Sequence, residues 1–222
     1  MRICIVECDA PWGHLRDRHG SFADMFTHWM APALPHARWH GLALHAGAPL
    51  PRPGDFDGYM ITGSRHGVHD DAPWIPPLAG FLRDLRARRI PVGGICFGHQ
   101  IMAHAFGARV EKSPSGWVLG PEAYDGKSAY AMHQDQVLTA PEGATRITGS
   151  PRCLIGRIEY DFPALSVQHH PEFSRDFMQA LLDEFGGTVI DQDQADAAAL
   201  QLDTPLDTDR IAAEFAQVLT SR

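Results

Sequence analysis

A cysteine flanked by glycines carries the clearest chemical signal in this 222-residue sequence. Cys96 lies in the run Gly94-Ile95-Cys96-Phe97-Gly98, between an apolar segment and a segment with helical periodicity. A nucleophile on a sharp strand-to-helix turn has a strained backbone, so the residues two positions before and after it must be small. The following helix would direct its positive end at Cys96, which favours the thiolate. The run predicts a nucleophilic cysteine, with a small buried residue at a tight turn as the alternative.

A second run supplies the groups that such a cysteine needs. A nucleophilic thiol requires a base, and the base requires a partner that holds its tautomer and orientation. His170 and Glu172 offer both, and Pro171 between them stiffens the turn so that the imidazole and the carboxylate can face the same side. The alternative is a surface turn with an incidental pair of histidines, because His-Pro-Glu is a short string.

Together the two runs resemble the class I glutamine amidotransferases. GICFGHQ at residues 94–100 precedes VQHHPEF at residues 167–173, and that family has a G-x-C-x-G-x-Q turn and a terminal H-P-E. The resemblance covers most of the chain. It implies that Cys96 is the nucleophile, that His170 is the general base and acid, and that Glu172 orients His170. It also implies attack on the side-chain amide of glutamine and hydrolysis of a γ-glutamyl thioester.

The same resemblance implies an oxyanion site and a substrate-binding site. Backbone N–H groups of Phe97 and of the turn at Gly63 and Ser64 would stabilise the tetrahedral oxyanion. Many family members have Gly-Gly-Pro at this turn, whereas residues 62–65 are Thr-Gly-Ser-Arg, so the donor within the turn is left open. Groups that would bind the ammonium and carboxylate of the substrate come from two further segments, namely Gln100, His133, Gln134 and Asp135.

The function implied is hydrolysis of glutamine, with release of ammonia for an acceptor on a separate protein. No ATP-binding domain is present, so a separate synthetase subunit is the expected partner, and no cofactor is expected. One alternative is a self-sufficient γ-glutamyl hydrolase or peptidase that acts on a small γ-glutamyl compound. A pocket closed around glutamine would favour the first function, and room beyond the amide nitrogen would favour the alternative. A non-catalytic binding or regulatory module is a further alternative, against which the intact Cys96, His170 and Glu172 argue.

Apolar strand-like runs alternate with helix-length segments in the first half of the sequence. The expected strands cover residues 2–7, 39–45, 58–62 and 91–95, and the expected helices cover residues 22–30, 74–89 and 98–107. This order favours the α/β class, with a mostly parallel central sheet flanked by helices. Short β-like runs with turn signals fill residues 108–168 and predict a small antiparallel or mixed β extension in the second half.

Helical periodicity returns near the end of the chain, over residues 174–186 and 207–219. The segment between them is polar and acidic, and we expect a surface connection with one helical stretch. We find no repeats and no linker rich in Gly, Pro or Ser. A single domain over residues 1–222 is therefore expected, in which residues 191–222 form a C-terminal connection and helix.

Composition excludes several other classes of protein. Lys and Arg number 19 against 27 Asp and Glu, a net charge of −8, which excludes a protein that coats nucleic acid. No run reaches the roughly 18–20 apolar residues of a membrane span, and the start lacks a signal-peptide pattern, so a cytoplasmic protein is expected. The four cysteines are scattered, and His36, His40 and His45 lack partners at a recognised spacing, so no metal site is expected.

Overall fold

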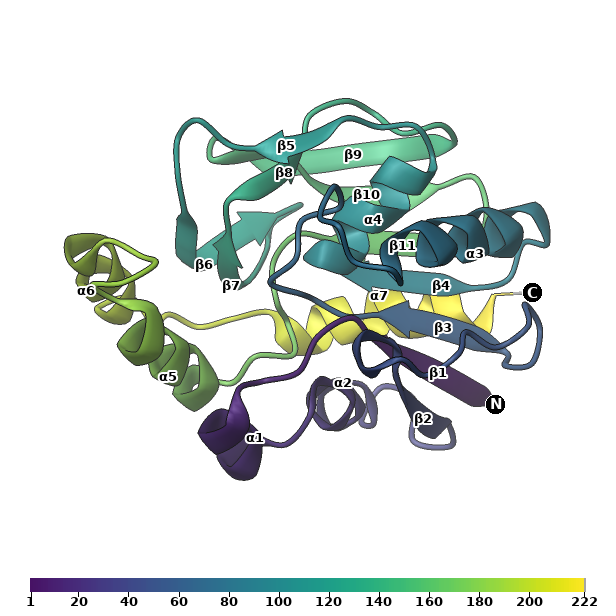
Figure 1. Cartoon of the computed structure of the whole chain (residues 1–222), viewed down its shortest axis with the longest axis horizontal. Coiled ribbons are helices and arrows are strands. Elements are labelled where there is room, and N and C mark those ends of the chain that lie inside the picture. The colour runs from purple at the N-terminus through teal and green to yellow at the C-terminus, as the bar shows by residue number, and fades with distance from the viewer. Residues whose placement is uncertain (222) are drawn as a thin grey trace.

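A seven-stranded sheet runs through the middle of the chain, of which the computed structural model describes residues 1–221 (Figure 1). Its strands are β1 (Arg2–Glu7), β2 (Arg38–Ala43), β3 (Gly58–Ile61), β4 (Val92–Ile95), β9 (Ala144–Ser150), β10 (Cys153–Tyr160) and β11 (Ala164–Val167). Their order across the sheet is β2-β1-β3-β4-β11-β10-β9. The first five in this order are parallel, whereas β10 and β9 pair antiparallel. The prediction of a mostly parallel α/β sheet is confirmed.

Two short antiparallel pairs lie apart from the central sheet. β5 (Val110–Lys112) pairs with β8 (Asp135–Val137), and β6 (Val118–Tyr124) pairs with β7 (Lys127–His133). Together with β9 and β10 they form the antiparallel extension expected in the second half. The junction of β7 and β8 holds residues 133–135, which were expected to bind substrate.

Four helices cover the two faces of the sheet, namely α2 (Phe22–Met30), α7 (Thr208–Thr220), α3 (Ile75–Ala87) and α4 (Phe97–Ala105). Alternate side chains of β1 contact helices on opposite faces of the sheet. Ile3 and Ile5 pack with α2 and α7, whereas Cys4 and Val6 pack with α3 and α4. Successive side chains of a strand point to opposite faces, so a strand covered on both sides is apolar throughout.

Among the described residues, two helices were not predicted from the sequence: α1 (Gly13–His19), and the short 3-10 helix η1 (Leu44–Ala46), which follows β2 where the strand was expected to continue to residue 45. α1 buries only Leu15, so its sequence has no apolar periodicity. It lies beside α5 (Arg175–Phe185), beyond the end of the central sheet (Figure 1). The expected helical stretch in the acidic connection is α6 (Gln192–Ala199). Among residues 1–221 no helix is long and apolar enough to cross a membrane.

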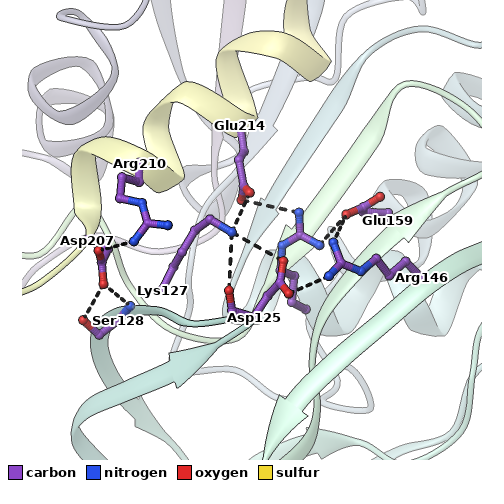
Figure 2. A network of polar contacts seen from close by, with 9 residues as sticks. Asp125, Lys127, Ser128, Arg146, Glu159, Asp207, Arg210 and Glu214 are labelled. Carbon is purple, nitrogen blue, oxygen red and sulfur yellow. Dashed lines mark hydrogen bonds and ion pairs between the residues drawn. The ribbon is translucent and has the colours of Figure 1, made fainter.

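A polar network ties the C-terminal helix to β7 (Figure 2). Asp207, just before α7, accepts hydrogen bonds from the Ser128 amide at 3.0 Å and from its hydroxyl at 3.1 Å. The other carboxylate oxygen of Asp207 pairs with Arg210 at 2.8 Å. Lys127 reaches across to Glu214 of α7, with 2.8 Å between nitrogen and oxygen. Asp207 is the N-cap residue of α7, but its carboxylate bonds to the strand and not to the first amides of the helix.

Two arginines of this network differ in burial. The side chain of Arg157 in β10 is 6% exposed and contacts Glu159 at 2.6 Å and Glu214 at 3.4 Å. The side chain of Arg146 in β9 is 52% exposed and contacts Asp125 at 2.6 Å (Figure 2). A buried charge depends on its partners far more than an exposed one does.

Candidate active site

Cys96 lies on a strained turn between β4 and α4. Its φ of 53° and ψ of −104° fall in a region that non-glycine residues rarely adopt. A Cβ atom on Gly98 would overlap the carbonyl group of Ile61, 2.9 Å from its carbon, and a Cβ atom on Gly94 would lie 2.6 Å from the sulfur of Met102. The structure therefore supplies the steric reason for small residues on both sides of Cys96.

His170 follows β11 and is held on three sides. Its Nδ1 lies 2.7 Å from Oε1 of Glu172, and its backbone N–H donates to the Tyr130 carbonyl at 2.6 Å. Its ring stacks on Phe173, with centroids 4.0 Å apart and planes inclined by 9°. The side chains of His170 and Glu172 are only 6% and 1% exposed. The imidazole therefore has one orientation, and the contact with Phe173 was not expected from the sequence.

The pairing of β4 with β11 brings Cys96 and His170 to the same edge of the sheet. The strands are parallel neighbours, and the Cys96 N–H donates to the Val167 carbonyl at 2.9 Å. A Cβ atom on Gly63 would lie 2.9 Å from Cε1 of His170 and 3.8 Å from Cβ of Cys96. Burial would lower the pKa of His170, but the Cys96 thiolate and the Glu172 carboxylate outweigh it and raise the pKa to about 10.

The turn at residues 62–65 lies beside this pair, and its hydrogen bonds narrow the choice of oxyanion donor. The Thr62 N–H donates to a carbonyl of β1 at 3.1 Å, and the Arg65 N–H donates to the Asp9 carboxylate at 2.9 Å. The N–H groups of Gly63 and Ser64 bond to no acceptor among the described residues. The turn thus offers the two amides that the resemblance indicated, and the Phe97 amide opens α4 next to Cys96.

An ion pair that the sequence did not predict joins this turn to the loop after β1. The Arg65 guanidinium contacts both carboxylate oxygens of Asp9, at 2.8 and 2.7 Å, and lies 4.7 Å from the ring centre of Trp12. Burial would raise the pKa of Asp9, but the hydrogen bonds from Arg65 outweigh it and hold the pKa below its usual value. Asp9 and Arg65 are 56 positions apart, so no local pattern could pair them.

The predicted substrate-binding residues meet at the junction of β7 and β8. Gln100 is buried, and its amide nitrogen donates to the Asp135 carbonyl at 2.8 Å. Nδ1 of His133 lies 3.2 Å from the same carbonyl, and burial lowers the pKa of His133 to about 3, so its ring is neutral. Gln100 and His133 therefore brace the segment that carries Gln134 and Asp135.

A cavity of about 660 Å³ lies over Cys96. Most of the predicted site residues line it, namely Gly63, Ser64, Cys96, Gln100, His133, Gln134, Asp135 and His170. Glu172 and Phe97 do not line it. Within residues 1–221, no group of three or more His, Cys, Asp or Glu side chains is arranged to hold a metal ion.

Comparisons with known proteins identify the family of this chain. Residues 54–176 match the family model described as Glutamine amidotransferase class-I. The chain is 27% identical over 243 residues to a glutamine amidotransferase-like protein of Schizosaccharomyces pombe, an alignment that covers 98% of both. It is 32% identical over 162 residues to γ-glutamyl peptidase 4 of Arabidopsis thaliana, which covers 64% of both.

A further relative and a solved structure are also similar to this chain. The chain is 31% identical over 137 residues to a subunit of the glutamine-hydrolysing GMP synthase of Archaeoglobus fulgidus, over 56% of this chain and 70% of that protein. A crystal structure of a glutamine amidotransferase from Methylobacillus flagellatus shares its fold, with a TM-score of 0.74 and 23% identity. That match covers 98% of this chain and 92% of the other.

Proposed function

Because the chain belongs to the class I glutamine amidotransferase family, we propose that it hydrolyses a γ-glutamyl amide through a thioester on Cys96. The main support is that Cys96, on its strained turn, lies beside the buried pair of His170 and Glu172, whose side chains are 2.7 Å apart. A nucleophile, a base and a group that orients the base are the parts that acyl transfer requires.

The reaction has two halves, in which His170 moves the protons. The Cys96 thiolate attacks the amide carbon, the imidazolium of His170 protonates the departing amine, the C–N bond breaks, and the γ-glutamyl group remains on sulfur. Water then attacks the thioester while His170 takes its proton, and glutamate leaves as the thiolate is restored. Glu172 stabilises the imidazolium and holds its tautomer throughout.

Backbone amides would stabilise the charge that develops on the substrate oxygen. Phe97 N–H opens α4, where the helix dipole adds positive potential. The Gly63 and Ser64 N–H groups are supported as the opposing donors because their two neighbours in the turn, Thr62 and Arg65, already bond to protein oxygens. The carboxylate of Asp135 lines the cavity and can accept the ammonium of the γ-glutamyl group.

Two kinds of leaving amine are compatible with this chemistry. Ammonia from glutamine would pass to an acceptor on a separate synthetase subunit, which similarity to the GMP synthase of Archaeoglobus fulgidus supports. A larger amine would leave from a γ-glutamyl compound, which similarity to γ-glutamyl peptidase 4 supports. The cavity of about 660 Å³ suits a ligand larger than glutamine, since pockets for drug-sized ligands span about 300–1,000 Å³. Its size favours the second candidate.

Replacement of the nucleophile tests the proposed function. We expect Cys96→Ala to abolish release of glutamate from glutamine and from γ-glutamyl amides while the protein stays folded by circular dichroism. Cys4→Ala makes the same substitution at a buried cysteine of β1 and should retain activity. Burial raises the pKa of the Cys4 thiol to about 12, so a glutamine-mimicking diazoketone should label Cys96 and spare Cys4. Wild-type protein that releases no glutamate and takes up no label would instead favour a non-catalytic module.

A further inference from the structure

We propose that one half of the cavity binds the amine part of the substrate, and that the preferred substrates are γ-glutamyl amides of amines with a bulky apolar group. This substrate class rests on the proposed function. The relevant half of the cavity is an apolar wall, which we define by Trp12, Leu15, Phe177, Leu181, Phe185 and Val189.

The apolar wall comes from α1, α5 and the segments next to them. The rings of Trp12 and Phe185 lie 4.5 Å apart, inclined by 45°, and join the two helices. Trp12 and Val189 are 36% and 60% exposed, so large apolar surface faces the solvent at this end of the cavity. Exposed apolar surface that lines the same cavity as a nucleophile indicates an apolar ligand, because its burial is favourable.

The rest of the cavity combines polar residues with further apolar ones, among them Phe22, Trp117 and Met132. Gln100, His133, Gln134 and Asp135 supply polar groups that suit the zwitterionic end of a γ-glutamyl group. Cys96 lines the same cavity as both sets of residues. A γ-glutamyl group on the polar side would therefore direct its amide nitrogen, and whatever that nitrogen carries, toward the apolar wall.

The Arg65–Asp9 ion pair and the His14–Glu184 contact engage two polar groups near the apolar wall, whereas Lys112, which also lines the cavity, lies in no ion pair among residues 1–221. Arg65, beside Trp12, contacts both carboxylate oxygens of Asp9. At the outer end, His14 of α1 lies 3.2 Å from Glu184 of α5. A polar or charged amine would compete with these contacts, and ammonia would bury no apolar surface. An alkyl or aromatic amine is the leaving group that this end of the cavity suits.

A graded series of substrates tests this assignment. The full chain is assayed for glutamate release from the γ-glutamyl amides of methylamine, butylamine and phenethylamine, with glutamine as reference. We expect kcat/KM to rise at least about tenfold from the methylamide to the phenethylamide, since each apolar group placed in a pocket adds roughly tenfold or more.

A matched pair of variants locates the effect in the apolar wall. Leu181→Ala removes apolar surface from the wall and should lower the ratio of kcat/KM for phenethylamide to that for methylamide by about threefold to tenfold. Leu200→Ala makes the same change at a leucine that is 88% exposed after α6 and outside the cavity, and it should leave that ratio unchanged.

The outcomes separate this inference from the proposed function. Equal kcat/KM across the series, or values that fall with amine size, would overturn the assignment of the apolar wall while glutamate release still supported the thioester chemistry. A ratio that Leu181→Ala does not change would also overturn it. No glutamate release from any member of the series would instead count against the proposed function itself.

Discussion

Glu172→Gln isolates the effect of one charge on the candidate base. In the folded protein Oε1 of Glu172 lies 2.7 Å from Nδ1 of His170, and both side chains are almost fully buried. Glutamine has the same shape and keeps an oxygen that accepts a hydrogen bond from the ring. The variant therefore removes the carboxylate charge while it leaves the orienting contact in place.

The size of the effect follows from the distance and the surroundings. Two unit charges about 4 Å apart interact by about 4 kcal/mol at an effective dielectric constant of about 20. One pKa unit corresponds to about 1.36 kcal/mol, so the loss of the carboxylate should lower the pKa of His170 by about 3 units at most. Neighbouring charges commonly shift a pKa by about 1–3 units. Starting from about 10 in the native protein, the pKa of His170 should fall to about 7–9.

The pH dependence of glutamate release at low substrate concentration measures this shift. In the proposed reaction the departing amine takes its proton from the imidazolium of His170, so kcat/KM should fall as the pH rises through the pKa of that group. We expect the basic limb of the profile for Glu172→Gln to lie about 1–3 pH units below that of the wild-type protein. Measurements between about pH 6 and 11 cover the basic limbs of the wild-type protein and of the variant.

The free energy of unfolding should also depend on the protonation of His170, and it should fall as the pH rises. The folded-state pKa of His170 lies above its ordinary value of 6.5, so its ion pair stabilises the fold fully below about pH 6.5. That stabilisation is lost as the pH rises toward about 10, and in Glu172→Gln it should be smaller and lost at lower pH. Urea unfolding at a series of pH values gives the free energy of unfolding that this requires.

A matched control makes the result decisive. Glu142→Gln makes the same substitution at a side chain that is 80% exposed and 3.4 Å from Arg86, and the basic limb should not move. If folded Glu172→Gln kept the basic limb of the wild-type protein, the carboxylate would not control the proton on His170, and the reasoning from their contact would be refuted.

Two further substitutions test packing and buried charge by urea unfolding. Gly98→Ala places a Cβ atom 2.9 Å from the carbonyl carbon of Ile61 and should lower the free energy of unfolding by about 2 kcal/mol or more. Gly13→Ala adds a Cβ atom with no atom within 4 Å and should change the free energy of unfolding by about 1 kcal/mol at most. Equal effects of the two substitutions would contradict the close contact at Gly98. Arg157→Met removes two contacts to carboxylates and should cost about 1–3 kcal/mol, and the exposed Arg146→Met should cost about 1 kcal/mol or less.

Local signals made much of the fold and part of the site predictable. Gly94 and Gly98 indicated a tight strand-to-helix turn at Cys96 from their spacing alone, because only close backbone contact demands two such glycines. Strand-like runs and helical periodicity likewise predicted the elements on either side. The helix expected over residues 22–30 is α2, which Ser21 caps together with Asp24.

Pairings between distant segments could not be predicted in this way. Residues 164–167 form a strand of only four residues, and nothing in them indicates that β11 lies parallel to β4 in the middle of the sheet. The contact of Arg65 with Asp9 joins two loops, and the apolar wall joins α1 to α5. α1 buries only Leu15 and shows no apolar periodicity, so neither this helix nor its contact with α5 could be predicted.

The proposed nucleophile and base lie on other elements than the apolar wall, which bears on how the protein could change its substrate. Cys96 and His170 follow β4 and β11, and the ladder hydrogen bonds between these buried parallel strands fix their relative position. The apolar wall belongs instead to α1 and α5, which lie beyond the end of the sheet (Figure 1). We therefore expect substitutions at Trp12 or Leu181 to alter which amine is bound without moving the proposed nucleophile and base, as sites carried by a rigid scaffold allow.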